Sequence, residues 1–220
     1  MKKLHLGCGR KYLEGYINID CPVMNQTVQT DLFADEYVDI TVLKYEDNSI
    51  DEIRLHHVFE HFSRPVALAL LCRWRNWLKP GGLLRIETPD ANACFRMMLS
   101  PFTSFECKQQ VMRHLFGSHE ASWAFHADGW YEGKFRIVLN KLGFTKIKSL
   151  KSKWELLRNI EIEAIKSNDS FKFVDFEKAT KEILRMSAIK LKKNNNVIIP
   201  ESETEMINVW IDTWKAIYEV

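Results

Sequence analysis

The sequence predicts an α/β fold: a mostly parallel seven-stranded sheet with helices on both faces, followed by a C-terminal helical hairpin. Strand and helix patterns alternate through the first two-thirds of the chain, as is typical of a parallel sheet covered by helices. The 220 residues, 46% of them hydrophobic, suffice for one core with an appendage. Because the pattern changes near residue 168, we expect a sheet domain over residues 1–168 and a helical extension over 169–220.

Seven short apolar segments have the pattern of strands. They are residues 3–6, 16–19, 27–31, 50–56, 83–87, 144–150 and 160–166. The last two are separated by only about ten residues, so we expect a hairpin-like antiparallel pair at a sheet edge.

Two helices are predicted between these strands. The first has Ser63 as a plausible cap and Pro65 in its first turn, and it stops at the Lys79-Pro-Gly-Gly82 sequence. The second covers residues 135–142 and ends at Gly143.

The C-terminal extension contains helical patterns at 176–193 and 203–218. One continuous apolar face of the last helix contains Ile207, Trp210, Ile211, Trp214, Ile217 and Tyr218. Two uses of this face remain open: it covers the core of the sheet domain, which is the favoured interpretation, or it forms the interface of a homodimer.

Residues 4–20 combine a glycine turn between two strands with a carboxylate at the end of the second strand. Gly7 and Gly9 allow a sharp bend and a close approach to backbone N–H groups. Asp20 follows at the position where α/β sheets bind ligands, and it can accept hydrogen bonds from ribose hydroxyls. Since a third glycine is missing and the gap leaves no room for a crossover helix, NAD is disfavoured.

Composition excludes several classes of function. Lys and Arg (31) nearly balance Asp and Glu (29), so the sequence gives no reason to expect nucleic-acid binding. The five cysteines are odd in number and include no C-x-x-C pair, which indicates a protein whose thiols stay reduced. We find no signal peptide and no run long enough for a membrane span, and therefore expect a cytoplasmic location.

Several short motifs occur in a fixed order between residues 4 and 166. They are Leu4-His-Leu-Gly-Cys-Gly9, Gly15-Tyr-Ile-Asn-Ile-Asp20, Thr30-Asp-Leu32, Glu46-Asp-Asn-Ser-Ile-Asp51, His57-Val-Phe-Glu-His61, Leu78-Lys-Pro-Gly-Gly82 and Pro89-Asp90. In this order they resemble the class I S-adenosylmethionine-dependent methyltransferases, whose sheet is Rossmann-like. More narrowly they look like a small bacterial branch, often of the type 11 kind, that is associated with surface-polysaccharide gene clusters.

The resemblance implies S-adenosylmethionine as the cofactor and a set of residues that bind it. These residues are Gly7, Cys8, Gly9, Asp20, Asp31, Leu32 and His57. Backbone N–H groups near Cys8 and Gly9 would hold the methionine carboxylate with help from Arg10 or Lys11. Asp20 would bind the ribose, Asp31 and Leu32 would contact the adenine, and His57 would lie on the methionine side. Cys8 is interpreted as a small side chain beside the turn, not as a nucleophile.

The methyl group of the cofactor is already activated, so the acceptor decides whether a base is needed. Methylation of a hydroxyl is faster with a general base, and histidine suits this role. The main candidates are His126, His57 and His61, and Glu60, His119 and Asp128 are further ones. His126 is favoured because residues 116–131 are rich in glycine and aromatic residues, which could form a lid over the acceptor or a satellite hydrophobic cluster.

We predict transfer of a methyl group to a small-molecule or glycan acceptor, with oxygen favoured. His57-x-x-x-His61 lacks a third ligand by spacing, so no metal is expected. Two alternatives remain: a methyltransferase-like module without turnover, and a protein or RNA methyltransferase. The small acceptor or sugar is the expected partner, with a possible homodimer through the C-terminal helices.

Overall fold

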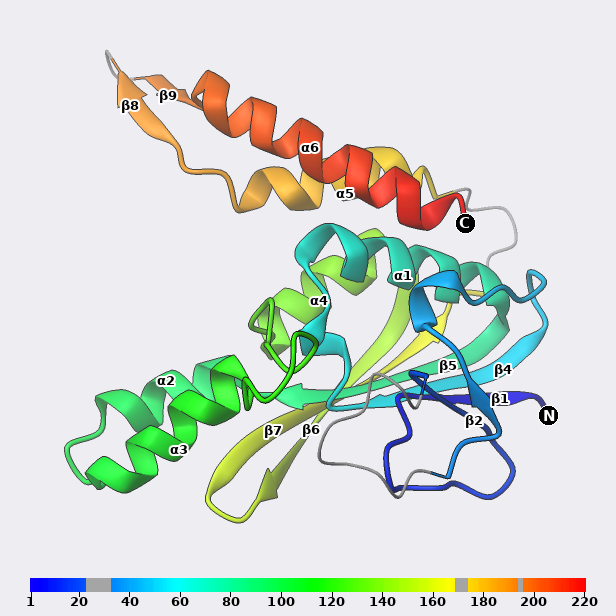
Figure 1. Cartoon of the computed structure of the whole chain (residues 1–220). Coiled ribbons are helices and arrows are strands. Elements are labelled where there is room, and N and C mark those ends of the chain that lie inside the picture. Colours follow the sequence, from blue (N-terminus) through cyan, green and yellow to red (C-terminus); the bar gives the residue numbers. More distant parts are fainter. Residues whose placement is uncertain (23–32, 169–173, 194–195) are drawn as a thin grey trace.

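The computed structural model describes residues 1–22, 33–168, 174–193 and 196–220. A seven-stranded sheet in the order β3-β2-β1-β4-β5-β7-β6 forms its centre (Figure 1). The strands are β1 (Lys3–Leu6), β2 (Ile17–Asp20), β3 (Glu36–Tyr37), β4 (Ile50–His56), β5 (Leu78–Pro89), β6 (Phe144–Trp154) and β7 (Leu157–Lys166). All neighbours are parallel except β7, which is antiparallel to both β5 and β6. The predicted mostly parallel seven-stranded sheet is confirmed.

Strand boundaries differ from the prediction at three places. The predicted strand 27–31 lies outside the described residues, and the strand that pairs with β2 is Glu36–Tyr37. β5 begins at Leu78 rather than at residue 83, because its pairing with β4 starts at Leu78 and resumes at Leu83 after an irregularity. The β6–β7 connection is only two residues long, so the hairpin is tighter than expected, although its antiparallel pairing and edge position are confirmed.

Two predicted helices cover the sheet. α1 (Arg64–Trp77) and α4 (Glu132–Lys141) lie on the same side of it (Figure 1). Residues 7–16, which connect β1 to β2, contain no helix, as the short spacing required. The main core fills the space between sheet and helices and includes Phe59, Trp74 and Phe135, each fully buried.

Four further helical segments were not predicted. They are the α-helices α2 (Ala91–Leu99) and α3 (Phe105–Phe116) and the 3₁₀ helices η2 (Ile40–Val42) and η3 (Phe59–His61). Side-chain caps start both α-helices: Asp90 accepts from the N–H groups of Asn92 and Ala93, and Ser104 accepts from that of Cys107. α2 and α3 extend beyond the carboxyl ends of the strands (Figure 1), where they can shape a substrate site.

The C-terminal extension contains two helices and a strand ribbon. Its elements are α5 (Phe176–Met186), β8 (Leu191–Lys193), β9 (Asn196–Ile198) and α6 (Glu201–Tyr218). The predicted helix 176–193 is therefore wrong after Met186, because the chain forms an antiparallel pair there instead.

α6 packs across α1 and shares the main core. Ile207, Ile211 and Trp214 are buried in it, and the Arg73 guanidinium on α1 donates to the carbonyl of Ile217 at 3.2 Å. This packing agrees with the favoured interpretation, in which the last helix covers the core; a homodimer and the division at residue 168 stay predictions. None of the helices in the described ranges has the length and hydrophobicity needed to cross a membrane.

Candidate active site

The carboxyl ends of β1, β2, β4 and β5 meet at one edge of the sheet. β1 lies between β2 and β4, so the chain leaves it toward β2 and later enters the sheet again on its other side. Ligands of open α/β sheets bind in the crevice at such a switch point. Two groups of residues occupy this edge: a glycine turn (Gly7, Cys8 and Gly9) after β1, and a histidine cluster after β4 and β5.

Glycine is required at the start of the turn. Gly7 has a φ of +67°, and a Cβ atom there would lie 2.2 Å from Cγ2 of Val58. The N–H groups of Gly7 and Cys8 both donate to the carbonyl of Ile19, at 2.8 and 3.1 Å. The turn is thereby fixed against the end of β2, next to Asp20.

Asp20 faces the turn and is bound to it. Its Oδ2 accepts from the N–H of Gly9 at 2.6 Å, and its Oδ1 accepts from the N–H of Cys21 at 2.8 Å. A carboxylate has about four acceptor sites, so these bonds orient the group without preventing it from binding ribose hydroxyls. Gly7, Cys8, Gly9 and Asp20 thus lie together as the motif predicted.

The turn offers its backbone differently from what we expected. The N–H groups of Cys8 and Gly9 donate to acceptors within the protein, to Ile19 and Asp20. Burial, followed by the neighbouring Asp20 charge, raises the pKa of the Cys8 thiol to about 12, so the thiol is not a nucleophile at neutral pH. Asp31 and Leu32, the predicted adenine contacts, lie outside the described residues.

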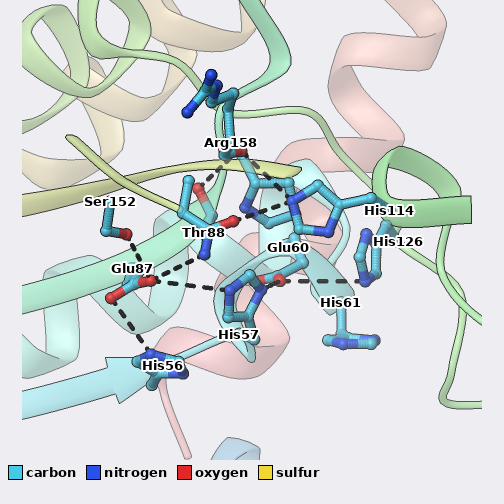
Figure 2. Close-up of polar contacts among 12 residues, drawn as sticks. His56, His57, Glu60, His61, Glu87, Thr88, His114, His126, Ser152 and Arg158 are labelled. Atoms are coloured by element: carbon cyan, nitrogen blue, oxygen red, sulfur yellow. Dashed lines mark hydrogen bonds and ion pairs between the residues drawn. The ribbon is translucent and has the colours of Figure 1, made fainter. Parts of the chain in front are cut away.

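The histidine cluster consists of His56, His57, Glu60, His61, Glu87, His114 and His126. Figure 2 shows these side chains pointing toward one another at the ends of β4 and β5. They come from β4, the following η3, β5, α3 and the segment before α4. All three histidines predicted as catalytic candidates, His57, His61 and His126, are in this cluster.

His57 is the central member. It has a φ of +54°, a backbone conformation that is uncommon outside glycine and asparagine and that is found at functional sites. Its Nδ1 lies 3.1 Å from Oε1 of Glu60, and its Nε2 lies 3.9 Å from Oε1 of Glu87. Burial alone would lower the pKa of His57, but the hydrogen bond and charge of Glu60, with the charge of Glu87, raise it above the ordinary value.

Glu60 is an ionised carboxylate inside the protein. Only 2% of its surface is exposed, and burial would raise its pKa. The hydrogen bond and charge of His57, and then the nearby His126, lower the pKa below the ordinary value instead. The buried Glu60 therefore pairs with the half-buried His57, and its carboxylate orients the imidazole and stabilises its protonated form.

Glu87 holds the other side of the cluster. Its carboxylate lies 3.3 Å from Nε2 of His56 and accepts from Ser152 and Asn159 at 2.9 and 3.0 Å. Burial would raise the pKa of Glu87, but the His56 hydrogen bond and charge, with the bonds from Ser152 and Asn159, lower it to about 2. Asn159 also lies 2.9 Å from Nε2 of His114, which links β7 to the cluster.

His126 and His61 lie behind Glu60. Nε2 of His126 is 4.0 Å from Oε1 of Glu60, and the His126 and His61 rings meet edge to face at 4.7 Å. Burial lowers the pKa of His126 to about 4, so His126 is neutral at pH 7 and a weak base. Nδ1 of His61 lies 2.8 Å from the carbonyl of Trp123, which holds the ring in place.

Two groups in the cluster have the spacing of metal ligands within the described residues. They are His56, His57 and Glu87, and Glu60, His61 and His126. Neither of these groups contains both His57 and His61, the pair that the sequence spacing offered; the second joins His61 to Glu60 and His126 instead. Since Glu60 is engaged with His57 and Glu87 with three partners, both groups are equally well explained as a hydrogen-bonded network.

Other candidates lie apart from the cluster. His119 stacks on Phe125 at 4.1 Å, and Asp128 binds Lys134 at 2.6 Å. Sequence reasoning missed Glu87, His114 and Asn159. A charged residue near the end of a predicted strand was the one available signal for Glu87, whereas His114 and Asn159 are brought in only by α3 and the β6–β7 hairpin.

Comparisons with known proteins agree with this geometry. Residues 4–86 match the family described as a methyltransferase domain. The search of curated proteins found no match.

Similar solved structures share the fold at low sequence identity. An S-adenosylmethionine-dependent methyltransferase from Archaeoglobus fulgidus has a TM-score of 0.52 and 14% identity, covering 75% of this chain and 86% of that one. A complex of the Trm112 methyltransferase activator with a putative methyltransferase from Haloferax volcanii has a TM-score of 0.51 and 13% identity, covering 78% of this chain and 84% of that one. The 1,6-didemethyltoxoflavin-N1-methyltransferase from Burkholderia thailandensis, solved with S-adenosylhomocysteine, has a TM-score of 0.50 and 14% identity, covering 76% of this chain and 71% of that one.

These likenesses establish the fold, a Rossmann-like α/β sheet with flanking helices. With the domain match over residues 4–86, they support the predicted class of enzyme, an S-adenosylmethionine-dependent methyltransferase. They support S-adenosylmethionine as its cofactor in the same way, and methyl transfer in general as its reaction.

Proposed function

We propose that this protein transfers the methyl group of S-adenosylmethionine to a hydroxyl of a small-molecule or glycan acceptor. The observation that carries the proposal is the placement of the His57–Glu60 pair directly beside the glycine turn and Asp20. Val58, the neighbour of His57, packs against Gly7, so the segment after β4 lies next to the turn after β1.

The residues at the turn fit the cofactor. Gly7 lets the turn pack closely against Val58, where a side chain would collide, and Asp20 presents an oriented carboxylate for the ribose. Because the Cys8 and Gly9 N–H groups are engaged, the side chains of Arg10 and Lys11 are left to hold the methionine carboxylate. Asp31 and Leu32 remain the proposed adenine contacts.

His57 is the proposed base. Bound S-adenosylmethionine supplies an electrophilic methyl group on a sulfonium. The Nδ1–H of His57 donates to Glu60, so Nε2 carries the lone pair that accepts the acceptor's hydroxyl proton. Glu60 then stabilises the imidazolium, as the carboxylate does in other carboxylate–histidine pairs. His61 and His126 surround Glu60 and act as positioning residues.

The finer assignments rest on the resemblance and the composition. The motif order favours a bacterial branch associated with surface-polysaccharide gene clusters, so a sugar hydroxyl is the preferred acceptor. None of the five cysteines forms a disulfide, which agrees with a reduced, cytoplasmic setting.

A methyltransferase-like module without turnover is the second candidate. The ordered pair of His57 and Glu60 argues against it, since a buried carboxylate is costly to retain without a role. RNA methylation is disfavoured, because the net charge is only +2.

Calorimetry with S-adenosylhomocysteine tests the cofactor part. We expect saturable binding to the wild-type protein, and lack of binding would remove the proposal. Transfer of labelled methyl groups to a panel of sugars and small hydroxyl compounds tests the reaction. Binding of the cofactor product without transfer to any acceptor would favour the module without turnover.

The network interpretation of the cluster predicts independence from metals. Dialysis against a chelator should leave the rate of methyl transfer within about twofold, since no step of the proposed proton transfer needs a cation. Loss of activity that added zinc, magnesium or manganese restores would contradict it.

A further inference from the structure

A basic cavity lies beside the histidine cluster, between α2 and the β6–β7 hairpin. Its volume is about 490 Å³, within the range of small-molecule sites. The positive side chains that line it are Arg96, Lys151, Lys153 and Arg158. They come from α2, β6 and β7, so only the folded protein brings them together.

The charge of Lys151 helps to lower the pKa of Glu132, but the four cations are not held in ion pairs by any residue that the structure describes. In the described parts of the chain, none of them takes part in a salt bridge. The acidic residue that lines the cavity is Asp90, whose Oδ1 already accepts from the N–H groups of Asn92 and Ala93 at the start of α2. Four like charges around one cavity repel each other unless an anion binds there.

The cavity also borders residues that contact the histidine cluster. Ser152 and Asn159 line it, and both donate to Glu87 of the histidine cluster. Asn159 contacts His114 as well, at 2.9 Å. A molecule that fills the cavity therefore touches the residues that hold Glu87, and Glu87 in turn lies 3.9 Å from Nε2 of His57 (Figure 2).

We propose that this cavity binds a phosphate group of the methyl acceptor, so that the substrate is a phosphorylated small molecule such as a sugar phosphate. That the bound molecule is the methyl acceptor rests on the proposed function, whereas the binding of phosphate does not. Arginine binds phosphate oxygens through two parallel N–H bonds, and lysine adds a point charge. The two arginines and two lysines supply both kinds of contact.

This assignment divides the substrate between two regions. The phosphate binds among the basic side chains, and the uncharged part with the reacting hydroxyl extends past Ser152 and Asn159 toward His57. Holding one end of the acceptor at a distance from the reacting atom fixes its orientation, which is how binding energy contributes to rate.

Calorimetric titration of the full chain with glucose 1-phosphate tests the proposal, with and without saturating S-adenosylhomocysteine. We expect binding in both conditions, weakened by added salt, and no binding of glucose. Lys153→Glu and Arg96→Glu should each weaken it by more than about tenfold. The matched control, Lys148→Glu, makes the same change of charge on the same strand and should leave the affinity unchanged.

Several outcomes would overturn the proposal. They are absence of binding at about 10 mM ligand, equal weakening by Lys148→Glu and Lys153→Glu, and tighter binding of glucuronate than of glucose 1-phosphate. Thermal unfolding of each variant checks that these exposed substitutions leave the fold intact. Failure to bind S-adenosylhomocysteine while glucose 1-phosphate still binds would remove the proposed function and support the phosphate site.

Discussion

The glycine turn and the histidine cluster lie at the same edge of the sheet but are held by different forces. Backbone N–H groups and one carboxylate fix the turn, whereas the cluster is a network of side chains from separate elements. Backbone hydrogen bonds do not titrate near neutral pH, while imidazoles do. Cofactor affinity and proton transfer are therefore expected to respond to different substitutions.

The largest expected effect is on turnover through the cluster. His57→Asn removes the proposed base while keeping a residue that tolerates the positive φ of this position. We expect the kcat of methyl transfer to fall about 10²- to 10⁴-fold, with the affinity for S-adenosylhomocysteine unchanged by calorimetry. A parallel loss of cofactor affinity would show that the two regions are not separable.

The turn should show the reverse behaviour. Asp20→Ala removes the proposed ribose acceptor and should weaken S-adenosylhomocysteine binding by about 100-fold, the value of one or two hydrogen bonds to a charged group. Asp39→Ala, at the start of η2, is the control, since that carboxylate only caps a short helix. Equal affinities of the Asp20→Ala and wild-type proteins would remove the ribose assignment.

Substitutions of Gly7 and Gly15, two glycines of the same segment, should lower the stability of the protein by different amounts. Gly7→Ala brings both a strained φ and a collision with Val58, and should reduce the free energy of unfolding by about 2–4 kcal/mol. Gly15→Ala, at a φ of +79° with no atom within 4 Å, should cost only about 1–2 kcal/mol. Urea denaturation measures both. A double variant with Val58→Ala should recover part of the Gly7→Ala loss.

The smallest effect expected is a shift in the pH profile. In the proposed mechanism neutral His57 accepts the proton, so kcat should fall as the pH drops through its raised pKa. Glu60→Gln removes the charge that raises this pKa and leaves the burial that lowers it, so the acidic limb should move to lower pH. An unchanged limb would mean that another group is the base.

The two regions also differ in how far the sequence predicted them. Gly7, Gly9 and Asp20 lie within one β-turn-β unit, whose geometry follows from local spacing. Neither Glu87 nor His114 could be recognised as part of the cluster, because β5 and α3 meet there only through the sheet order and the packing of α3. The helix expected at 176–193 was wrong for a related reason, since the β8–β9 pairing outweighs local helical pattern.

The packing of α6 on α1 has a consequence for synthesis of the protein. Arg73 and its partner Ile217 are 144 residues apart, so the outer face of α1 leaves the ribosome long before its cover exists. Until then, the apolar side chains of α1 that α6 covers are available to chaperones and to other nascent chains. Because α6 is synthesised last, we expect the yield of native enzyme to depend on chaperones that bind the incomplete chain.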